Sequence, residues 1–161
     1  METKENTPSR IFTDSATIDQ VHSLIFNESF FVDEVRYDTE KKLVIIPFMR
    51  CFQGDDYKVI KRNLFREVYE LPVLKCELRI HDAEEFKLVD RGQVERHIFQ
   101  ALSYDKKVGR MDIKSYMPLD FYVYVSSFHI EYIELMKQGR AVFSQGRFIF
   151  NWESGPKFLD I

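Results

Sequence analysis

The amino-acid sequence predicts an α+β, β-rich fold: an antiparallel sheet or two-layer sandwich with one or two short helices. Three aromatic and β-branched runs, within residues 98–104, 110–117 and 121–128, are separated by short polar breaks, as in an antiparallel meander. Phe and Tyr are abundant, at 15 and 8 of 161 residues, and both favour strands. We therefore expect a flexible lead-in over residues 1–12 and one β-rich globular domain over residues 13–161.

A short helix is expected near the N-terminus. Asp14 or Ser15 is suited to begin it, because a short polar side chain can accept a hydrogen bond from an unpaired backbone amide of the first turn. Ile18, Val21 and Ile25 then fall on one stripe.

Two strands are expected to flank a turn at residues 38–41. The first covers residues 29–38, and the second covers residues 43–52. Apolar residues lie on both faces of the second strand, which predicts that it is covered on both sides. Pro47 lacks a backbone donor, so it indicates a bulge or an edge position.

Residues 57–70 can be assigned as either a helix or a strand. Ile60, Leu64 and Val68 recur every four residues, a spacing that suits both periodicities. The many charged residues between them favour the helix, which Pro72 would end. Both assignments stay open.

The clearest strand pattern follows at residues 73–80, where buried and exposed positions should alternate. A shorter strand is expected over residues 86–89, before the meander. After the meander, residues 131–138 predict a brief helix ended by Gly139. The apolar positions of the first strand are Leu74, Cys76, Leu78 and Ile80, and its charged positions are Lys75, Glu77 and Arg79.

The C-terminal region predicts one more hairpin, formed by residues 142–143 and 148–150. The tail over residues 152–161 is expected to run over the surface, held by Trp152 and Phe158.

Residues 35–49 resemble residues 102–117. In each segment a Tyr-Asp pair precedes two lysines, and an Asp side chain can hydrogen-bond the backbone two residues further on, which favours a turn. A duplicated hairpin and two unrelated hairpins both explain the similarity.

Residues with catalytic potential form no recognisable motif. The four histidines lack metal-ligand spacing, and no glycine-rich phosphate loop is present. The acidic group at residues 81–85 is interpreted as a turn. A serine nucleophile with a histidine base could be formed by Ser126 or Ser127 with His129, which are close in sequence. Neighbours in a strand point in opposite directions, however, so closeness in sequence does not bring these side chains together. We therefore expect a protein that is not an enzyme, with no metal and no cofactor.

Cys51 and Cys76 lie in apolar alternating runs, which predicts buried free thiols in a reducing compartment. No apolar run approaches the roughly 20 residues that span a bilayer, and the N-terminus lacks a secretory core. The expected location is cytoplasmic, without membrane contact.

Two groups of residues are candidates for binding. Tyr122 and Tyr124 could present an aromatic face to a partner, although such rows also form cores. The basic cluster combines positive charge with aromatic neighbours, as nucleic-acid sites do, but the net charge of −3 argues against nucleic acid. The basic cluster consists of Lys58, Lys61, Arg62 and Arg66.

Charge is unevenly distributed along the sequence. Residues 1–56 carry 11 acidic and 6 basic groups, whereas residues 57–161 carry 15 and 17. Such separation favours electrostatic steering of a partner. The sequence therefore predicts a non-enzymatic protein-interaction module, with self-association as its simplest variant. The alternative is a small-molecule-binding β domain with an aromatic pocket.

Overall fold

The computed structural model describes residues 8–51, 58–150 and 152–159. Its strands pair in an antiparallel sheet, with a 3-10 turn at Ser15–Thr17 leading into one α-helix, α1 (Ile18–Ile25). This confirms the predicted β-rich α+β fold. The strands are β1 (Ser9–Phe12), β2 (Ser29–Phe31), β3 (Arg36–Asp38), β4 (Leu43–Cys51), β5 (Lys58–Arg62), β6 (Arg66–Ile80), β7 (Ala83–Val89), β8 (Arg96–Asp105), β9 (Arg110–Ser115), β10 (Asp120–Val125), β11 (Ile130–Gly146) and β12 (Glu153–Leu159).

The chain divides into two compact units. Unit 1 comprises Met1–Met49 and Cys76–Leu135, and unit 2 comprises Arg50–Lys75 and Met136–Ile161. The long strands β6 and β11 each contribute residues to both units. The single globular domain expected over residues 13–161 stays a prediction, because units that share strands are compatible with one folding unit.

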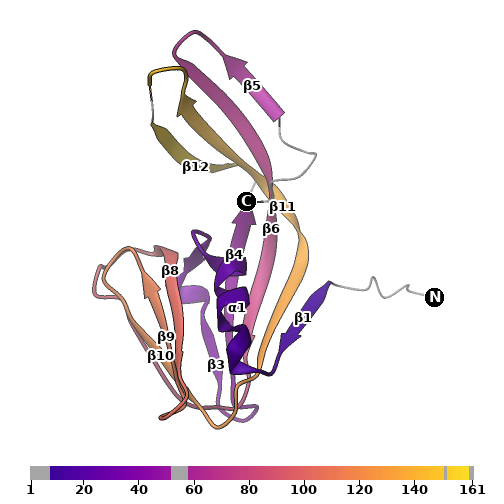
Figure 1. Cartoon of the computed structure of the whole chain (residues 1–161), viewed down its shortest axis with the longest axis vertical. Helices are drawn as coiled ribbons and strands as arrows, with labels where there is room; N and C mark the ends of the chain where they lie inside the picture. Colours follow the sequence, from indigo (N-terminus) through magenta and orange to yellow (C-terminus); the bar gives the residue numbers. More distant parts are fainter. Residues whose placement is uncertain (1–7, 52–57, 151, 160–161) are drawn as a thin grey trace, which may run out of the picture. The chain divides into compact units, whose positions relative to one another are not determined.

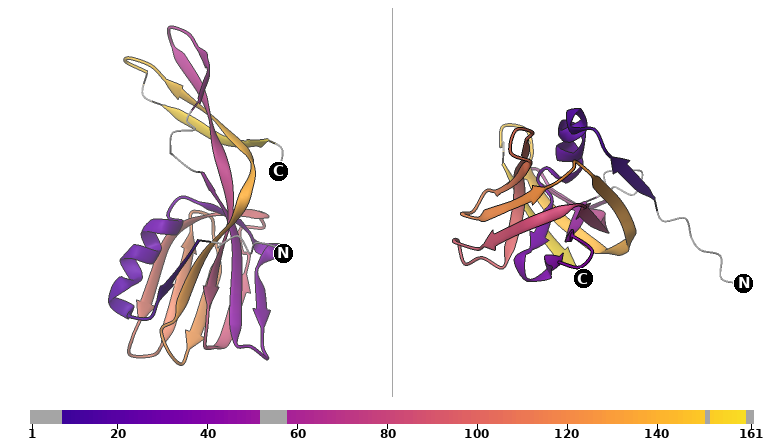
Figure 2. Two further views of the ribbon diagram at one scale, coloured as in Figure 1. Left: turned by 90° about the vertical axis from the view of Figure 1, so that its right-hand side faces the viewer. Right: turned by 90° about the horizontal axis from the view of Figure 1, so that it is seen from below.

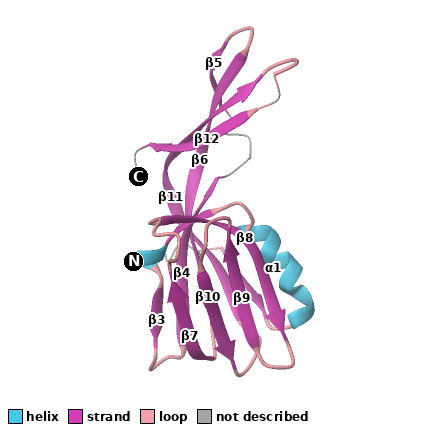
Figure 3. Cartoon of the chain, turned by 90° about the vertical axis from the view of Figure 1, so that its left-hand side faces the viewer, coloured by secondary structure: helices cyan, strands magenta, loops and turns pink. Residues whose placement is uncertain are grey.

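Strands β8, β9 and β10 form the predicted meander in unit 1, and β7 extends it beyond β10 (Figure 3). Met111 in β9 lies opposite Tyr104 of β8 on one side and opposite Val123 of β10 on the other. The alternation of apolar and polar residues fixes this register, since a shift by one residue would expose the buried face. The meander prediction is confirmed.

Helix α1 lies against β8 in unit 1 (Figure 2). The Asp14 carboxylate accepts a hydrogen bond from the Ala16 amide at 2.9 Å, as predicted for the first turn. Val21, Leu24 and Ile25 are the buried residues of the helix, and Ile18 at its start is half-buried. The helix prediction is confirmed.

Aspartate side chains stabilise two turns of unit 1. Asp38 accepts a hydrogen bond from the Lys41 amide at 3.0 Å, and Asp105 accepts one from the Lys107 amide at 2.9 Å. The Asp105 bond has the expected spacing of two residues, whereas the Asp38 bond spans three. Whether the two hairpins arose by duplication stays a prediction.

Strand β4 explains the position of Pro47. On one side β4 pairs first with β3, as far as Ile45, and then with β2, from Phe48 onward. Pro47 lies between the residues that pair with β3 and those that pair with β2. Its missing amide therefore costs no hydrogen bond to β2 or β3. The 3-10 turn Val32–Glu34 separates β2 from β3 and so divides the single strand that was predicted over residues 29–38.

The helix favoured over residues 57–70 is wrong. The described part of this segment forms β5 and the beginning of β6, joined by a turn in which the Asn63 side chain accepts hydrogen bonds from the amides of Phe65 and Arg66 at 3.0 and 2.7 Å. The charged residues of β5 are exposed on a strand with one paired neighbour. Pro72 does not end the segment, and β6 continues through it. Pro72 lies beyond Glu70, the last β6 residue that pairs with β5, so its missing amide interrupts no bond to β5.

The brief helix expected over residues 131–138 is also wrong, because β11 continues through this segment and past Gly139. Residues Ser9–Phe12 of the predicted lead-in form β1 and pair with residues 130–133. Backbone pairing with a strand distant in sequence therefore determines this structure.

The last hairpin differs from the predicted one. Its second strand is β12, from the expected surface tail, and residues 148–150 belong to the connection between β11 and β12.

In the predicted strand over residues 73–80, Glu77 is buried rather than exposed. An ion pair with Arg79 at 2.8 Å compensates its charge.

Neither cysteine forms a disulfide in the described part of the chain, and the predicted burial is confirmed for Cys76 but wrong for Cys51, which is half-buried. We expect one thiol to react with a thiol reagent in the native protein and two after denaturation, because burial blocks access to the Cys76 sulfur. A Cys51→Ser variant should lose the native reaction and keep the second. Two reactive thiols in the native protein would contradict the burial of Cys76.

In the described part of the chain, no helix is both long and apolar enough to span a bilayer.

Candidate functional site

One candidate surface of unit 1 is the Tyr–Arg face, defined by Arg110, Tyr122 and Tyr124. The two tyrosines alternate along β10 with the buried residues Phe121 and Val123, so both point away from the core. Their rings lie 5.6 Å apart between centroids and meet edge to face at 80°. Both are half-buried, which leaves part of each ring accessible to a partner.

Arg110 reaches the two rings from the neighbouring strand β9. Its guanidinium carbon lies 4.3 Å from the centroid of the Tyr122 ring and 5.9 Å from that of Tyr124. Its Nε and Nη2 atoms donate to Oδ1 of Asp112 at 3.0 and 2.5 Å. These contacts hold the guanidinium plane in one position.

The pKa of Arg110 is raised above its ordinary value, mainly by the hydrogen bond to Asp112 and further by a hydrogen bond to Tyr124. Arg110 therefore stays charged wherever the protein is folded, and its cation–π contact persists across the physiological pH range.

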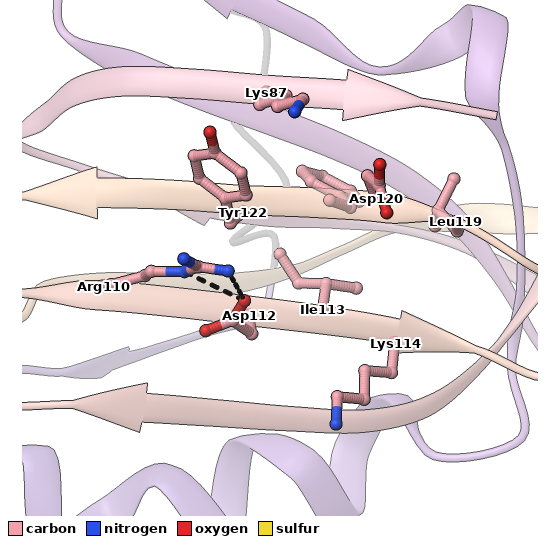
Figure 4. A pocket seen from close by; sticks show the side chains of 9 residues that line it. Lys87, Arg110, Asp112, Ile113, Lys114, Leu119, Asp120 and Tyr122 are labelled. Carbon is pink, nitrogen blue, oxygen red and sulfur yellow. Dashed lines mark hydrogen bonds and ion pairs between the residues drawn. The ribbon is translucent and has the colours of Figure 1, made fainter. Parts of the chain in front are cut away.

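An open hollow of about 360 Å³ adjoins the Tyr–Arg face (Figure 4). Asp112 and Asp120 are engaged, by Arg110 and by Arg91 respectively. Lys87 and Lys114 form no ion pair among the described residues, so the hollow can accept an anionic group. The hollow is lined by Lys87, Arg110, Asp112, Ile113, Lys114, Leu119, Asp120, Phe121 and Tyr122.

The predicted basic cluster lies in unit 2, whereas the predicted tyrosines lie in unit 1. All four basic side chains are exposed, on β5 and at the beginning of β6. Arg62 forms an ion pair with Glu67 at 2.6 Å across the hairpin. The cluster consists of Lys58, Lys61, Arg62 and Arg66.

Unit 2 also has a surface that the sequence patterns did not indicate, which we call the hairpin ends. It consists of the β5–β6 turn over residues 63–65 and the described β11–β12 connection, residues 147–150 with Trp152. Its apolar side chains project into solvent, and Phe148 and Ile149 are 76% and 88% exposed. The signal was present in the apolar run 148–150, which the sequence analysis assigned to a strand.

The two turns of the hairpin ends contact each other (Figure 1). The Arg147 amide donates to the Phe65 carbonyl at 3.0 Å, and Nη1 of Arg147 donates to the Asn63 carbonyl at 2.6 Å. The rings of Phe65 and Phe150 meet edge to face at 5.5 Å. The hairpin ends therefore form one surface.

Asp90, His97 and Ser115 form a hydrogen-bonded chain in unit 1. Oδ1 of Asp90 lies 3.0 Å from Nε2 of His97, and the Ser115 hydroxyl lies 2.8 Å from Nδ1. These residue types also form nucleophilic triads. Here, however, His97 is fully buried and stacks against Phe30, with ring centroids 5.7 Å apart. The hydrogen bonds from Asp90 and Ser115 are best explained as satisfying the two ring nitrogens of a histidine buried in the core.

The serine–histidine group considered in the sequence is arranged differently. His129 stacks on His81, with ring centroids 4.2 Å apart, and the Ser127 hydroxyl donates to Asp82. Residues 81–82 form the turn before β7, and Ala83 begins that strand. Among the described residues, no three His, Cys, Asp or Glu side chains gather in a group that could hold a metal ion.

Comparison with protein families, curated proteins and solved structures found no significant match. The geometry and charge of the Tyr–Arg face and of the hairpin ends therefore carry the functional inference.

Proposed function

We propose that the protein is a non-enzymatic module that binds another protein through the Tyr–Arg face. The observation that supports this is the stacking of Arg110 against the half-exposed Tyr122 ring, with Tyr124 beside it. Tyrosine and arginine are the residue types that most often dominate the energy of protein interfaces. Their rigid rings and fixed guanidinium lose little entropy on binding, which favours affinity.

The adjoining hollow supports a partner that inserts an acidic side chain. Lys87 and Lys114 supply positive charge at its border, and the half-buried side chains of Leu119 and Tyr122 supply apolar contact. A carboxylate placed there could reach a cation without displacing the Arg110–Asp112 pair.

Replacing Tyr122 with Ala is expected to weaken partner binding by about 30-fold, because hot-spot truncation costs about 2 kcal/mol or more. Arg110→Ala should have a similar effect. The partner is first captured on the full chain from native extract, and its dissociation constant is then measured by titration against each variant. Tyr116→Ala is the matched control, since Tyr116 is an exposed tyrosine of the same unit.

Equal binding by the Tyr122→Ala variant and the native chain would contradict the proposal. Arg110→Lys separates charge from geometry: it keeps the positive charge but lacks the planar group that stacks on the ring, so we expect weakened binding here as well.

The hollow also supports the alternative of a small-molecule-binding β domain. Its one accessible aromatic ring, that of Tyr122, together with Lys87 and Lys114, suits a small anionic ligand. The hollow is open, so such a ligand would keep much of its surface in water, and we rank this alternative second.

A further inference from the structure

The hairpin ends of unit 2 concentrate apolar side chains that keep much of their surface in solvent. Their exposure is greatest at Ile149 and Phe148 and falls to 41% and 42% at Phe150 and Trp152. Apolar surface gathered in one place indicates a contact with another molecule or with a membrane. The exposed apolar residues are Leu64, Phe65, Phe148, Ile149, Phe150 and Trp152.

The backbone holds these side chains outward. Phe148 has a φ of 58°, a left-handed conformation that is uncommon for a bulky residue. At Gly146 a Cβ atom would lie 2.0 Å from the Phe150 carbonyl oxygen, so only glycine permits this tight connection. Strained backbone of this kind is often found at functional segments.

Positive charge accompanies the apolar side chains. Lys61, Arg62 and Arg66 flank the β5–β6 turn, and Arg147 begins the β11–β12 connection. The sequence has no Asp or Glu from residue 58 to 66 or from residue 147 to 152. Unit 2 as a whole carries ten Lys and Arg against six Asp and Glu, whereas unit 1 carries 13 against 20.

We infer that the hairpin ends bind the surface of an anionic phospholipid bilayer. The apolar side chains of the two turns enter the boundary between headgroups and acyl chains, while the basic residues beside them meet the lipid phosphates. Apolar insertion or a few basic residues alone gives weak, reversible binding, and the two together give stable binding. Trp152 is less exposed than all of these apolar residues except Phe150, and tryptophan side chains favour the level of the lipid headgroups.

The observations favour a bilayer over a second copy of the chain. The strands beside the hairpin ends are protected against edge pairing, by the lysines of β5 and by Pro156 in β12. Ile149 and Phe148 are also much more exposed than Phe150 and Trp152. Such protruding side chains suit insertion into a lipid layer better than contact with a flat protein surface.

This inference goes beyond the proposed function, since it uses unit 2 and none of the residues of the Tyr–Arg face. The sequence predicted no membrane contact because it has no run long enough to span a bilayer. A surface contact through two turns requires no such run.

Trp152 provides the test, because it is the one Trp of the chain and lies on the hairpin ends. The full chain is mixed with vesicles of phosphatidylcholine alone, or with about a third of phosphatidylserine, a fraction that gives a strongly anionic surface. We expect co-sedimentation and a blue shift of Trp152 emission with the anionic vesicles, little change with the neutral ones, and weakening by salt.

Two variants separate the apolar and basic contributions. The double variant Phe148→Ser with Ile149→Ser should lower partitioning at least about tenfold, since each side chain loses its apolar contact. Lys61→Gln with Arg66→Gln should lower partitioning into anionic vesicles by about tenfold and leave the weak neutral binding unchanged. The matched control, Phe26→Ser with Val108→Ser, removes two exposed apolar residues of unit 1 and should bind as the native chain does.

Absence of binding to anionic vesicles, or equal binding by the Phe148→Ser, Ile149→Ser variant, would overturn the inference. A blue shift that grows with protein concentration in the absence of lipid would also overturn it, in favour of a second copy as the occupant. Far-UV circular dichroism checks that each variant keeps the native strand content. Loss of partner binding by Tyr122→Ala leaves the vesicle result unchanged, so the two proposals fail independently.

Discussion

Phe30→Ala is expected to lower the free energy of unfolding by about 3–5 kcal/mol, the usual cost of removing a buried aromatic ring. Phe30 is fully buried in unit 1, and its ring stacks on Phe99 with centroids 4.4 Å apart. It sits on β2 opposite Phe48 of β4 and His97 of β8, and its ring also stacks on that of His97. Its removal leaves a cavity that these strands cannot close without breaking their register.

Urea denaturation followed by circular dichroism measures the loss. Phe26→Ala is the matched control, because Phe26 is a 43% exposed phenylalanine of the same unit, and its truncation should cost less than about 1 kcal/mol. Similar losses for the two variants would contradict the placement of Phe30 at the centre of the core.

His97→Ala is expected to cost about 3 kcal/mol. The change removes a buried ring and leaves Asp90 and Ser115 without their shared partner, and an unsatisfied polar group in a core costs about 1–3 kcal/mol. Ser115→Ala and Asp90→Ala each remove one end of the chain of hydrogen bonds, so each should cost less than His97→Ala.

His129→Ala provides the control for this prediction, since His129 is half-buried and stacks on another histidine. Thermal unfolding of the four variants gives the order of their effects. If His97→Ala were as stable as His129→Ala, the hydrogen-bonded chain would not be part of the support of the core.

The sequence predicted the parts of the fold in which alternation is continuous. Residues 98–128 alternate with little interruption, so the meander and its buried face could be inferred before any partner strand was known. The helix after Asp14 was predictable for the same reason, because its cap and its apolar stripe are local.

The errors fell where local patterns suit two structures. Ile60, Leu64 and Val68 satisfy the helical and the strand period equally, and the charges between them were interpreted as one face of a helix. The actual choice depends on the Asn63 turn and on pairing across it. For residues 131–138 the deciding partners are β1, more than a hundred residues earlier in the chain, and β6 on the other side of β11.

The candidate sites show the same division. Strand parity places Tyr122 and Tyr124 on one face, as the sequence suggested, but the arrival of Arg110 above them depends on the register between β9 and β10. The hairpin ends were missed because an apolar run normally indicates a strand, and only the turn geometry brings residues 148–150 into solvent.

The sharing of β6 and β11 between the two units has a consequence for folding. Ser9 of β1 pairs with Ile133 of β11, so the unit 1 sheet cannot be completed until that distant segment is available. At about 5–20 residues per second, a ribosome takes on the order of ten seconds to synthesise the intervening chain. During this interval the apolar strands of unit 1 lack their last partner, and such long-range pairing is slow to form. We therefore expect folding to lag behind synthesis and to benefit from chaperones that bind exposed strands.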